Sequence, residues 1–268
     1  MTDSPYLVVP GKRFALKDRP TDDTGPFADK KEGNVACEAN LELLDELQER
    51  LYAESKHALL VVLQAMDTGG KDGTIEHVFS GVDPQGCSVT SFKAPTPLEL
   101  AHDYLWRIHE AAPPKGMIGI FNRSHYESVL VERVKNLVPK DVWSRRYKHI
   151  NDFEQLLSDE GVTIVKFFLH ISRDEQKRRL EARLADPQKH WKFNPNDLKE
   201  RERWDDYQAA YQDALRECST KNSPWYVVPA DKKWFRNWVV SDVLVRTLKG
   251  LKMQYPPAAK GLDRIVVR

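Results

Sequence analysis

A glycine-rich turn with one lysine and two carboxylates is the segment of this sequence best suited to chemistry. It spans 67–74, and its three glycines surround Lys71. Glycines let backbone N–H groups turn inward around phosphate oxygens, while a helix N-terminus behind them favours an anion. A lysine neutralises a phosphoryl group during its transfer. The predicted phosphate-binding residues of this turn are Thr68, Gly69, Gly70, Lys71, Asp72, Gly73 and Thr74.

The match to the phosphate-loop pattern G-x-x-x-x-G-K-[ST] is incomplete. Ala65 stands at the first glycine, and Asp72 replaces the hydroxyl after the lysine. A plain turn between a strand and a helix is the alternative interpretation. Asp67 would repel a bound phosphate unless a divalent cation lay between them, which makes Asp67 a candidate magnesium ligand. The alternative for Asp67 is a carboxylate that caps the helix or the turn.

A second polar turn follows the apolar segment 117–121. Asn122 stands where an aspartate usually holds the metal, and as a neutral ligand it would bind magnesium more weakly or through water. Arg123 is a candidate to stabilise charge on the transferred group, as arginines do at phosphoryl-transfer sites. A structural salt bridge is an equal alternative for Arg123.

A charged region over 173–203 contains a modest excess of basic residues. Arg179 and Arg183 lie four residues apart, on one face of a predicted helix, and Lys189 and Lys192 follow in the next loop. We interpret the region as a basic lid that closes over phosphates and excludes water, with Arg179, Lys189 and Lys192 as phosphate-binding residues. A solvated helical face is the alternative.

Hydrophobic patterning predicts the elements that position these residues. Short apolar segments, typical of buried strands, occur at 58–63, 87–92, 117–121, 162–171 and 225–228. Helical patterns occur at 34–55, 74–80, 97–111, 126–137, 173–185, 197–218 and 232–248. This alternation predicts an α/β fold with a five-stranded parallel sheet and helices on both faces. Ligands of such sheets lie beyond the carboxyl ends of the strands, where both polar turns fall.

Composition favours one α/β domain. The chain has 268 residues, 41% of them hydrophobic and 30% charged, and a net charge of +1. So small a charge attracts neither nucleic acid nor a membrane, and neither is an expected partner. The N-terminus lacks a signal-peptide pattern, and three unpatterned cysteines suit a reducing cytoplasm. We expect an irregular arm at 1–33, the domain at 34–250 and a tail at 251–268.

Several segments together resemble the polyphosphate kinase 2 family. The resemblance covers residues 35–250, nearly the whole chain. Its distinctive segments are DTGGKDGTI at 67–75, SFKAPT at 91–96, WR at 106–107, FNRSHYE at 121–127, ARL at 182–184, DP at 186–187, KHWK at 189–192, WDDY at 204–207 and PWYVVPADK at 224–232. These segments in this order are far more specific than the phosphate loop alone.

The resemblance implies a thymidylate-kinase-like P-loop kinase fold in three layers, with a helical lid at about 173–203. It implies transfer of a phosphoryl group between inorganic polyphosphate and AMP, ADP or ATP, with Mg²⁺, or Mn²⁺ in its place, as cofactor. It also suggests a homo-oligomer, a dimer or a tetramer. The positions that carry over as catalytic are Asp67, which would hold the metal, with Lys71, Asn122, Arg123 and Arg183. Lys93 joins the predicted phosphate-binding residues.

The turn at 122–127 departs from the form found in many family members. Those members have Asp-Arg-Ser-Trp-Tyr-Asn where this chain has Asn122 and Glu127 at the two ends. The form with Asn and Glu resembles the branch that accepts both AMP and ADP, so both residues are predicted to affect nucleotide selectivity. Two other functions remain open: an ATP-dependent nucleoside monophosphate kinase, and a non-catalytic module that binds polyphosphate.

Overall fold

Five parallel strands form the central sheet of the computed structural model, which describes residues 4–262, 265 and 267. The strand order is β2-β3-β1-β4-β5. The strands are β1 Ala58–Ala65, β2 Cys87–Ser91, β3 Ile118–Asn122, β4 Val162–His170 and β5 Trp225–Pro229. Every strand was predicted from its apolar run, and the parallel α/β architecture is confirmed. The strands β1, β3, β4 and β5 are largely buried because helices cover both faces of the sheet there. The edge strand β2 was predicted to be buried as well, but it is mostly polar and none of its residues is fully buried.

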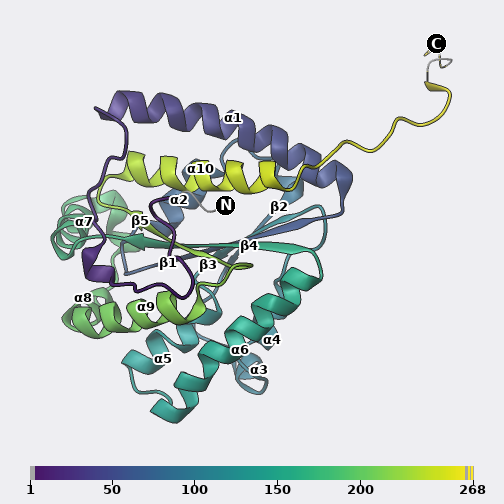
Figure 1. Ribbon diagram of the computed structural model, residues 1–268. Coiled ribbons are helices and arrows are strands. Elements are labelled where there is room, and N and C mark those ends of the chain that lie inside the picture. The colour runs from purple at the N-terminus through teal and green to yellow at the C-terminus, as the bar shows by residue number, and fades with distance from the viewer. Residues whose placement is uncertain (1–3, 263–264, 266, 268) are drawn as a thin grey trace.

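Helices cover the sheet in two layers (Figure 1). On one side, α1 Lys30–Glu54 packs along α10 Lys233–Gly250, and α10 also contacts α2 Lys71–Val78. On the other side, α6 Lys140–Asp159 packs against β4 and against α9 Trp204–Cys218. The sheet is therefore the middle of three layers, and its carboxyl edge carries the turns between strands and helices.

Three predicted helices are wrong in their extent. The helix predicted at 97–111 is divided into α3 Pro97–Leu100 and α4 Trp106–Glu110. Asp103 accepts a hydrogen bond from the N–H of Leu105 at 2.9 Å, a local turn that competes with the helix.

The helix predicted at 126–137 contains only a 3₁₀ turn, His125–Ser128, and α5 Val131–Val134. Asn136 then adopts a φ of 53°, which stops the helix. The long helix predicted at 197–218 is broken at Arg203 into α8 Asn196–Glu202 and α9.

One long helix, α6, was not predicted at all. It is amphipathic, but its buried apolar residues form a narrow stripe made of Ile150, Phe153 and Leu157. Their spacing is the helical i, i+3, i+7 pattern. The other positions are mostly polar, and the segment was not recognised as part of the α/β alternation for that reason. The missed helix covers β4 on the side opposite α10.

The arm before α1 lies on the body. Leu7 pairs with Tyr226 in an antiparallel bridge, and Val8 donates a backbone hydrogen bond to Trp225 at 2.9 Å. The helix α1 begins at Lys30, earlier than the predicted 34, because the Asp29 side chain caps it by accepting from the N–H of Glu32. Residues 1–3 of the predicted arm lie outside the described residues.

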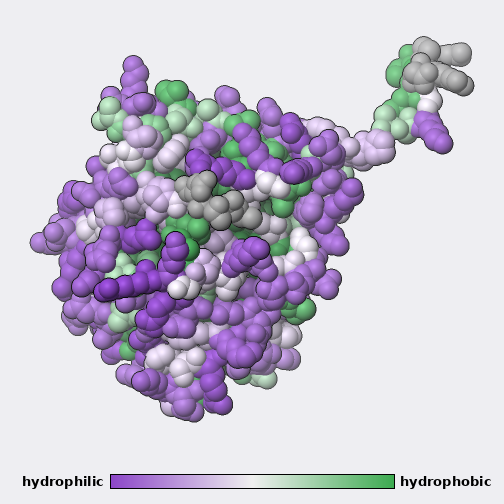
Figure 2. All heavy atoms as spheres, viewed as in Figure 1, coloured by the Kyte–Doolittle hydropathy of each residue, from purple (hydrophilic) through white to green (hydrophobic). Residues whose placement is uncertain are grey.

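The segment after α10 leaves the body (Figure 1). Met253 is still buried, whereas Tyr255 is exposed. Residues 263, 264, 266 and 268 of the predicted tail lie outside the described residues. The face seen in Figure 2 is mostly hydrophilic, with small separate hydrophobic areas. None of the helices within the described ranges is long and apolar enough to cross a membrane.

Candidate active site

The glycine-rich turn connects β1 to α2 at the carboxyl edge of the sheet. Thr68 has a φ of 61° and Gly70 a φ of 102°, so the backbone reverses within a few residues. At Gly69 a Cβ atom would lie 2.5 Å from the Cβ of Ala65 and 2.8 Å from the carbonyl oxygen of Met66. Only glycine fits there without a shift of the backbone. The geometry is that of a tight anion-binding turn ahead of a helix.

Lys71 is the first residue of α2 and folds back toward the strand. Its Nζ donates to the carbonyl oxygen of Ala65 at 3.3 Å. Burial, followed by the nearby Arg123, lowers the pKa of Lys71, although Asp67 opposes that shift. An ammonium held this way over the turn is in position to neutralise a phosphate that the glycines bind.

Asp67 and Arg123 meet across the two polar turns. The Nη2 atom of Arg123 lies 3.2 Å from Oδ1 of Asp67. The Nη1 atom of Arg123 lies 4.0 Å from a carboxylate oxygen of Glu127. Arg123 has a φ of 62°, which turns the chain sharply at the end of β3, and its N–H donates to the carbonyl oxygen of Leu63. The ends of β1 and β3 therefore bring these charges together.

Asn122 and Glu127 lie beside this pair. The side-chain amide of Asn122 donates to Oδ1 of Asp72 at 2.6 Å, which links the second polar turn to α2. Burial raises the pKa of Glu127, and the positive charges of Arg123 and Lys71 oppose that rise. Both residues predicted to affect nucleotide selectivity thus border the phosphate turn.

Arg179 on α7 Arg173–Ala185 lies behind the turn, and its predicted role needs correction. Its Nη1 donates to the carbonyl oxygens of Thr68 and Gly69, both at 3.1 Å. Its Nη2 donates to two further backbone carbonyls, and its Nε donates to Glu175 at 2.7 Å. All five N–H donors are therefore used within the protein. Arg179 therefore stabilises the backbone of the turn, and its guanidinium has no N–H group left to donate to a phosphate.

Arg183 and Asp197 face each other in the predicted lid. The Arg183 guanidinium lies 3.7 Å from Oδ2 of Asp197 and donates to the carbonyl oxygen of Lys192 at 3.3 Å. Burial and then the negative charge of Asp67 raise the pKa of Asp197 to about 6, against the influence of Arg183. Because the charge of Asp67 acts on Asp197, the helix α8 Asn196–Glu202 lies near the phosphate turn. Asp197 was missed in the sequence, because no spacing links it to Asp67.

The contacts of the other predicted phosphate-binding lysines involve neither Asp67 nor Arg123. Lys189 pairs with Asp186 at 2.7 Å, and the ammonium of Lys192 lies 4.8 Å from the ring centre of Trp191. Lys93 borders a groove of about 390 Å³ at the end of β2, where its carbonyl oxygen accepts from Arg107 at 2.9 Å.

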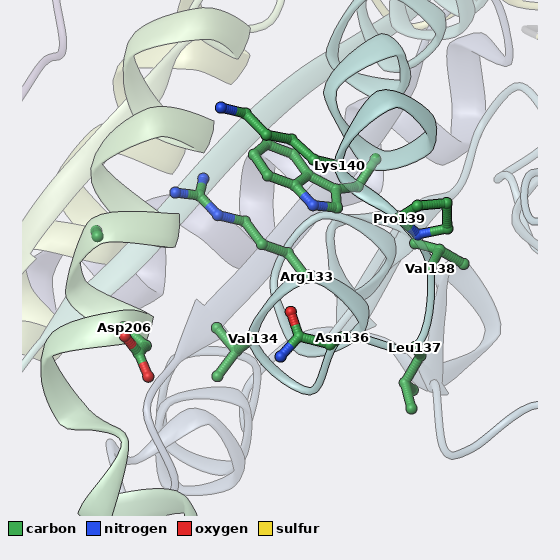
Figure 3. Close-up of a pocket in the computed structure, with 10 residues that line it drawn as sticks. Arg133, Val134, Asn136, Leu137, Val138, Pro139, Lys140 and Asp206 are labelled. Atoms are coloured by element: carbon green, nitrogen blue, oxygen red, sulfur yellow. The ribbon is translucent and has the colours of Figure 1, made fainter.

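A second groove, of about 630 Å³, lies between α5, the start of α6 and α9 (Figure 3). Arg133, Pro139, Trp143 and Asp206 are among the residues that line it. As far as the described residues go, its lining includes none of the predicted site residues. Arg133 pairs with Asp213 at 2.8 Å, and its charge is thereby already compensated.

The residues at the turn fit a divalent metal ion with few protein ligands. Within the described residues, no group of three acidic, histidine or cysteine side chains converges as a protein-only metal site. Magnesium at phosphoryl-transfer sites commonly uses one or two carboxylates, with phosphate oxygens and water completing the shell. Asp67 supplies one carboxylate at the entrance of the turn, with a quarter of its side chain exposed. Asp67 would hold such a divalent ion, which would supply positive charge to the phosphate oxygens.

Comparison with known proteins decides the family. The family model for polyphosphate kinase 2 matches residues 28–256. The chain belongs to the polyphosphate kinase 2 family. Members of this family are kinases that generally depend on a metal. The P-loop kinase fold expected from the resemblance is confirmed.

Relatives of the polyphosphate kinase 2 family align over almost the whole chain. An AMP/ADP-polyphosphate phosphotransferase of Meiothermus ruber is 57% identical over 263 residues, 98% of each protein. An ADP-polyphosphate phosphotransferase of Rhodopseudomonas palustris is 47% identical over 264 residues, covering 94% of this chain and 91% of the relative. The crystal structure of polyphosphate kinase 2 from Arthrobacter aurescens TC1 superposes with a TM-score of 0.93 at 45% identity, over 97% of this chain and 93% of that one.

Proposed function

We propose that this chain transfers a phosphoryl group between inorganic polyphosphate and nucleotides, favouring conversion of AMP to ADP and of ADP to ATP. The observation that carries the proposal is the glycine turn at 67–73, with Lys71 over it and Arg123 beside Asp67. The names of the relatives from Meiothermus ruber and Rhodopseudomonas palustris support polyphosphate as donor and AMP or ADP as acceptor.

The reaction is direct in-line transfer, in which the protein positions the phosphates and neutralises their charge. Mg²⁺, or Mn²⁺ in its place, would bind at Asp67 and polarise the phosphoryl oxygens. Backbone N–H groups of the turn hold the phosphate, and Lys71 neutralises its charge. Arg123 at one side and Arg183 in the lid stabilise negative charge as it shifts from donor to acceptor. Closure of the lid at 173–203 would exclude water from the transfer.

Asn122 and Glu127 are proposed to set the choice between AMP and ADP. Asn122 is held by Asp72, and Glu127 lies next to Arg123, so both act where the acceptor phosphate must approach. The variant Asn122→Asp replaces the neutral amide at this position with a carboxylate. We expect it to change the ratio of the kcat/KM values for AMP and ADP by several-fold. An unchanged ratio would remove Asn122 from selectivity.

An assay with separate products tests the function. AMP, ADP and GDP are each incubated with polyphosphate and Mg²⁺, and ADP, ATP and GTP are measured separately. We expect ADP from AMP and ATP from ADP. Transfer from ATP to AMP with none from polyphosphate would instead identify a nucleoside monophosphate kinase. Tight polyphosphate binding without turnover under saturating Mg²⁺ would identify a binding module.

We also propose that the protein is cytoplasmic and forms a dimer or tetramer. Cys37, Cys87 and Cys218 are all free thiols, which suits a reducing compartment. Light scattering on the purified protein gives the oligomeric mass directly, and a monomer at micromolar concentration would contradict the proposed assembly.

A further inference from the structure

A buried arginine lies directly behind the phosphate turn. Arg236, near the start of α10, is 2% exposed. Its Nε and Nη2 both donate to one neutral acceptor, Oδ1 of Asn237, at 3.1 and 2.8 Å. Across the described residues, no carboxylate oxygen lies within 4.0 Å of its guanidinium and no hydrogen bond from its Nη1 is present.

The guanidinium lies against two glycines of the turn. A Cβ atom at Gly70 would lie 2.0 Å from Nη1 of Arg236 and 3.4 Å from Nη1 of Arg179. At Gly73 a Cβ atom would lie 3.8 Å from Nη2 of Arg236. Glycine at 70 is therefore required twice, by its positive φ and by the approach of a charged side chain.

The surroundings of Arg236 add positive charge instead of cancelling it. Burial and then the charge of Arg179 lower the pKa of Arg236 to about 9. Burial, Arg179 and Arg236 also lower the pKa of Lys233, and Glu175 only partly opposes them. Glu175 is already paired with Arg179 at 2.7 Å. A buried charge left without a counter-ion is costly, so this arrangement lowers the stability of the protein without ligand.

We infer that Arg236 is a phosphate-binding residue whose counter-ion is the phosphate chain held in the turn. The inference rests on the proposed function and deepens it: the anion in the turn is held from the α10 side as well as by Lys71. An uncompensated arginine costs stability in the free protein and strengthens binding of the anion that compensates it. Arg179 does not fill this role, because its own donors are all used.

Two variants that remove the charge imbalance in different ways test the inference. Arg236→Met deletes the charge and keeps most of the volume. Asn237→Asp keeps the arginine and gives it a carboxylate where the amide oxygen now accepts. Both should bind tripolyphosphate roughly ten- to hundred-fold more weakly, the range for hydrogen bonds to charged groups. Both should melt at the same temperature as the wild type or higher when no ligand is present.

Calorimetric titration of tripolyphosphate and thermal unfolding without ligand provide the two measurements. Arg246→Met on the same helix is the matched control, since Arg246 is exposed and, in the described part of the chain, pairs with Asp242 alone. This variant should leave the affinity for tripolyphosphate and the melting temperature unchanged. Arg236→Lys restores the charge and should recover part of the lost affinity.

A purely structural role predicts the opposite pattern. Arg236→Met would then lower the melting temperature, and Asn237→Asp would bind tripolyphosphate as tightly as the wild type; either result overturns the inference. If Arg236→Met does not fold, Asn237→Asp decides alone. The proposed function fails separately: a wild-type protein that neither binds nor uses polyphosphate contradicts that proposal, whatever the variants do.

Discussion

At the residue scale, charge at the phosphate turn is balanced between a few side chains. Lys71, Arg123 and Arg183 bring positive charge to the same region as Asp67 and Asp197. Such a cluster is expected at a site that binds a polyanion with a divalent cation, because substrate and metal supply the missing charges.

Lys71→Met should lower kcat at least ~100-fold, as loss of one donor to the transition state does. The substitution keeps the apolar stem of the side chain and deletes only the ammonium over the turn. The measurement is the rate of ATP formation from ADP at saturating polyphosphate and Mg²⁺. Lys56→Met, an exposed residue paired with Glu54, is the control and should keep the wild-type rate. A Lys71→Met enzyme with a near-normal rate would mean that the turn does not take part in the transfer.

Asp197→Asn should stabilise the free protein at neutral pH. The pKa of Asp197 is raised to about 6 from an ordinary 3.8, so the folded state binds this proton more tightly than the unfolded state does. The wild type loses stability as the pH rises from about 4 through about 6, by roughly 1 kcal/mol once solvent screening is allowed for.

Melting temperatures from pH 4 to pH 8 check this prediction. Asp197→Asn should melt above the wild type at pH 7–8, and the two curves should converge near pH 4. Asp152→Asn, which removes an exposed pair with Lys148, should follow the wild type throughout. A constant difference between Asp197→Asn and the wild type at every pH would show that Asp197 does not titrate in this range.

At the element scale, the contact between α1 and α10 supports the start of α10, which carries Arg236. Gly33 in α1 lies against the ring of Trp234, where a Cβ atom would lie 2.2 Å from a ring carbon. The two helices meet there through a glycine, because no larger residue leaves room for the indole.

Gly33→Ala should destabilise the protein by about 1–3 kcal/mol, the usual cost of overpacking. Gly250→Ala at the end of α10 is the matched control, since nothing lies within 4 Å of its Cβ position. Alanine there should be neutral or stabilise by up to ~1 kcal/mol. Guanidinium unfolding measures both variants. Equal midpoints for the two would show that the indole moves aside without cost.

At the scale of the whole molecule, a buried network of hydrogen bonds connects the sheet to α6 and α9 on one face. Lys166 of β4 donates to Glu154 of α6, to the hydroxyl of Tyr126 and to the carbonyl oxygen of Cys218. His125 also contacts Glu154 at 3.1 Å. Burial alone would raise the pKa of Glu154, but Lys166 and His125 outweigh it and bring the pKa to about 2.

Glu154→Gln should therefore cost about 3–5 kcal/mol at pH 7, since it leaves the Lys166 charge buried and uncompensated. In the wild type, the contribution of Glu154 is present above about pH 4.5 and is lost as the pH falls toward about 2. Guanidinium unfolding at pH 7 and pH 3 measures both effects. The double variant Glu154→Gln with Lys166→Met should regain most of the loss. No recovery in the double variant would mean that the two charges do not act as a pair.

The sequence by itself determined which segments form the five strands and where the phosphate turn lies. Both depend on neighbours along the chain: apolar runs predict buried strands, and glycines with a lysine between a strand and a helix predict an anion-binding turn. The Asp67–Lys71 segment was recognised for that reason. The helix α6 carried its own periodic signal in Ile150, Phe153 and Leu157, but a mostly polar surface obscured it.

Only the tertiary structure decided how charges from distant segments are paired. Arg179 and Arg183 lie on one helix and look equivalent in the sequence, yet one donates to the backbone of the turn and the other faces Asp197. Arg236 stands more than 160 residues after the turn in the chain and still touches Gly70. Hydrogen-bond partners and burial set the role of such residues, and both exist only once the strands and helices have packed.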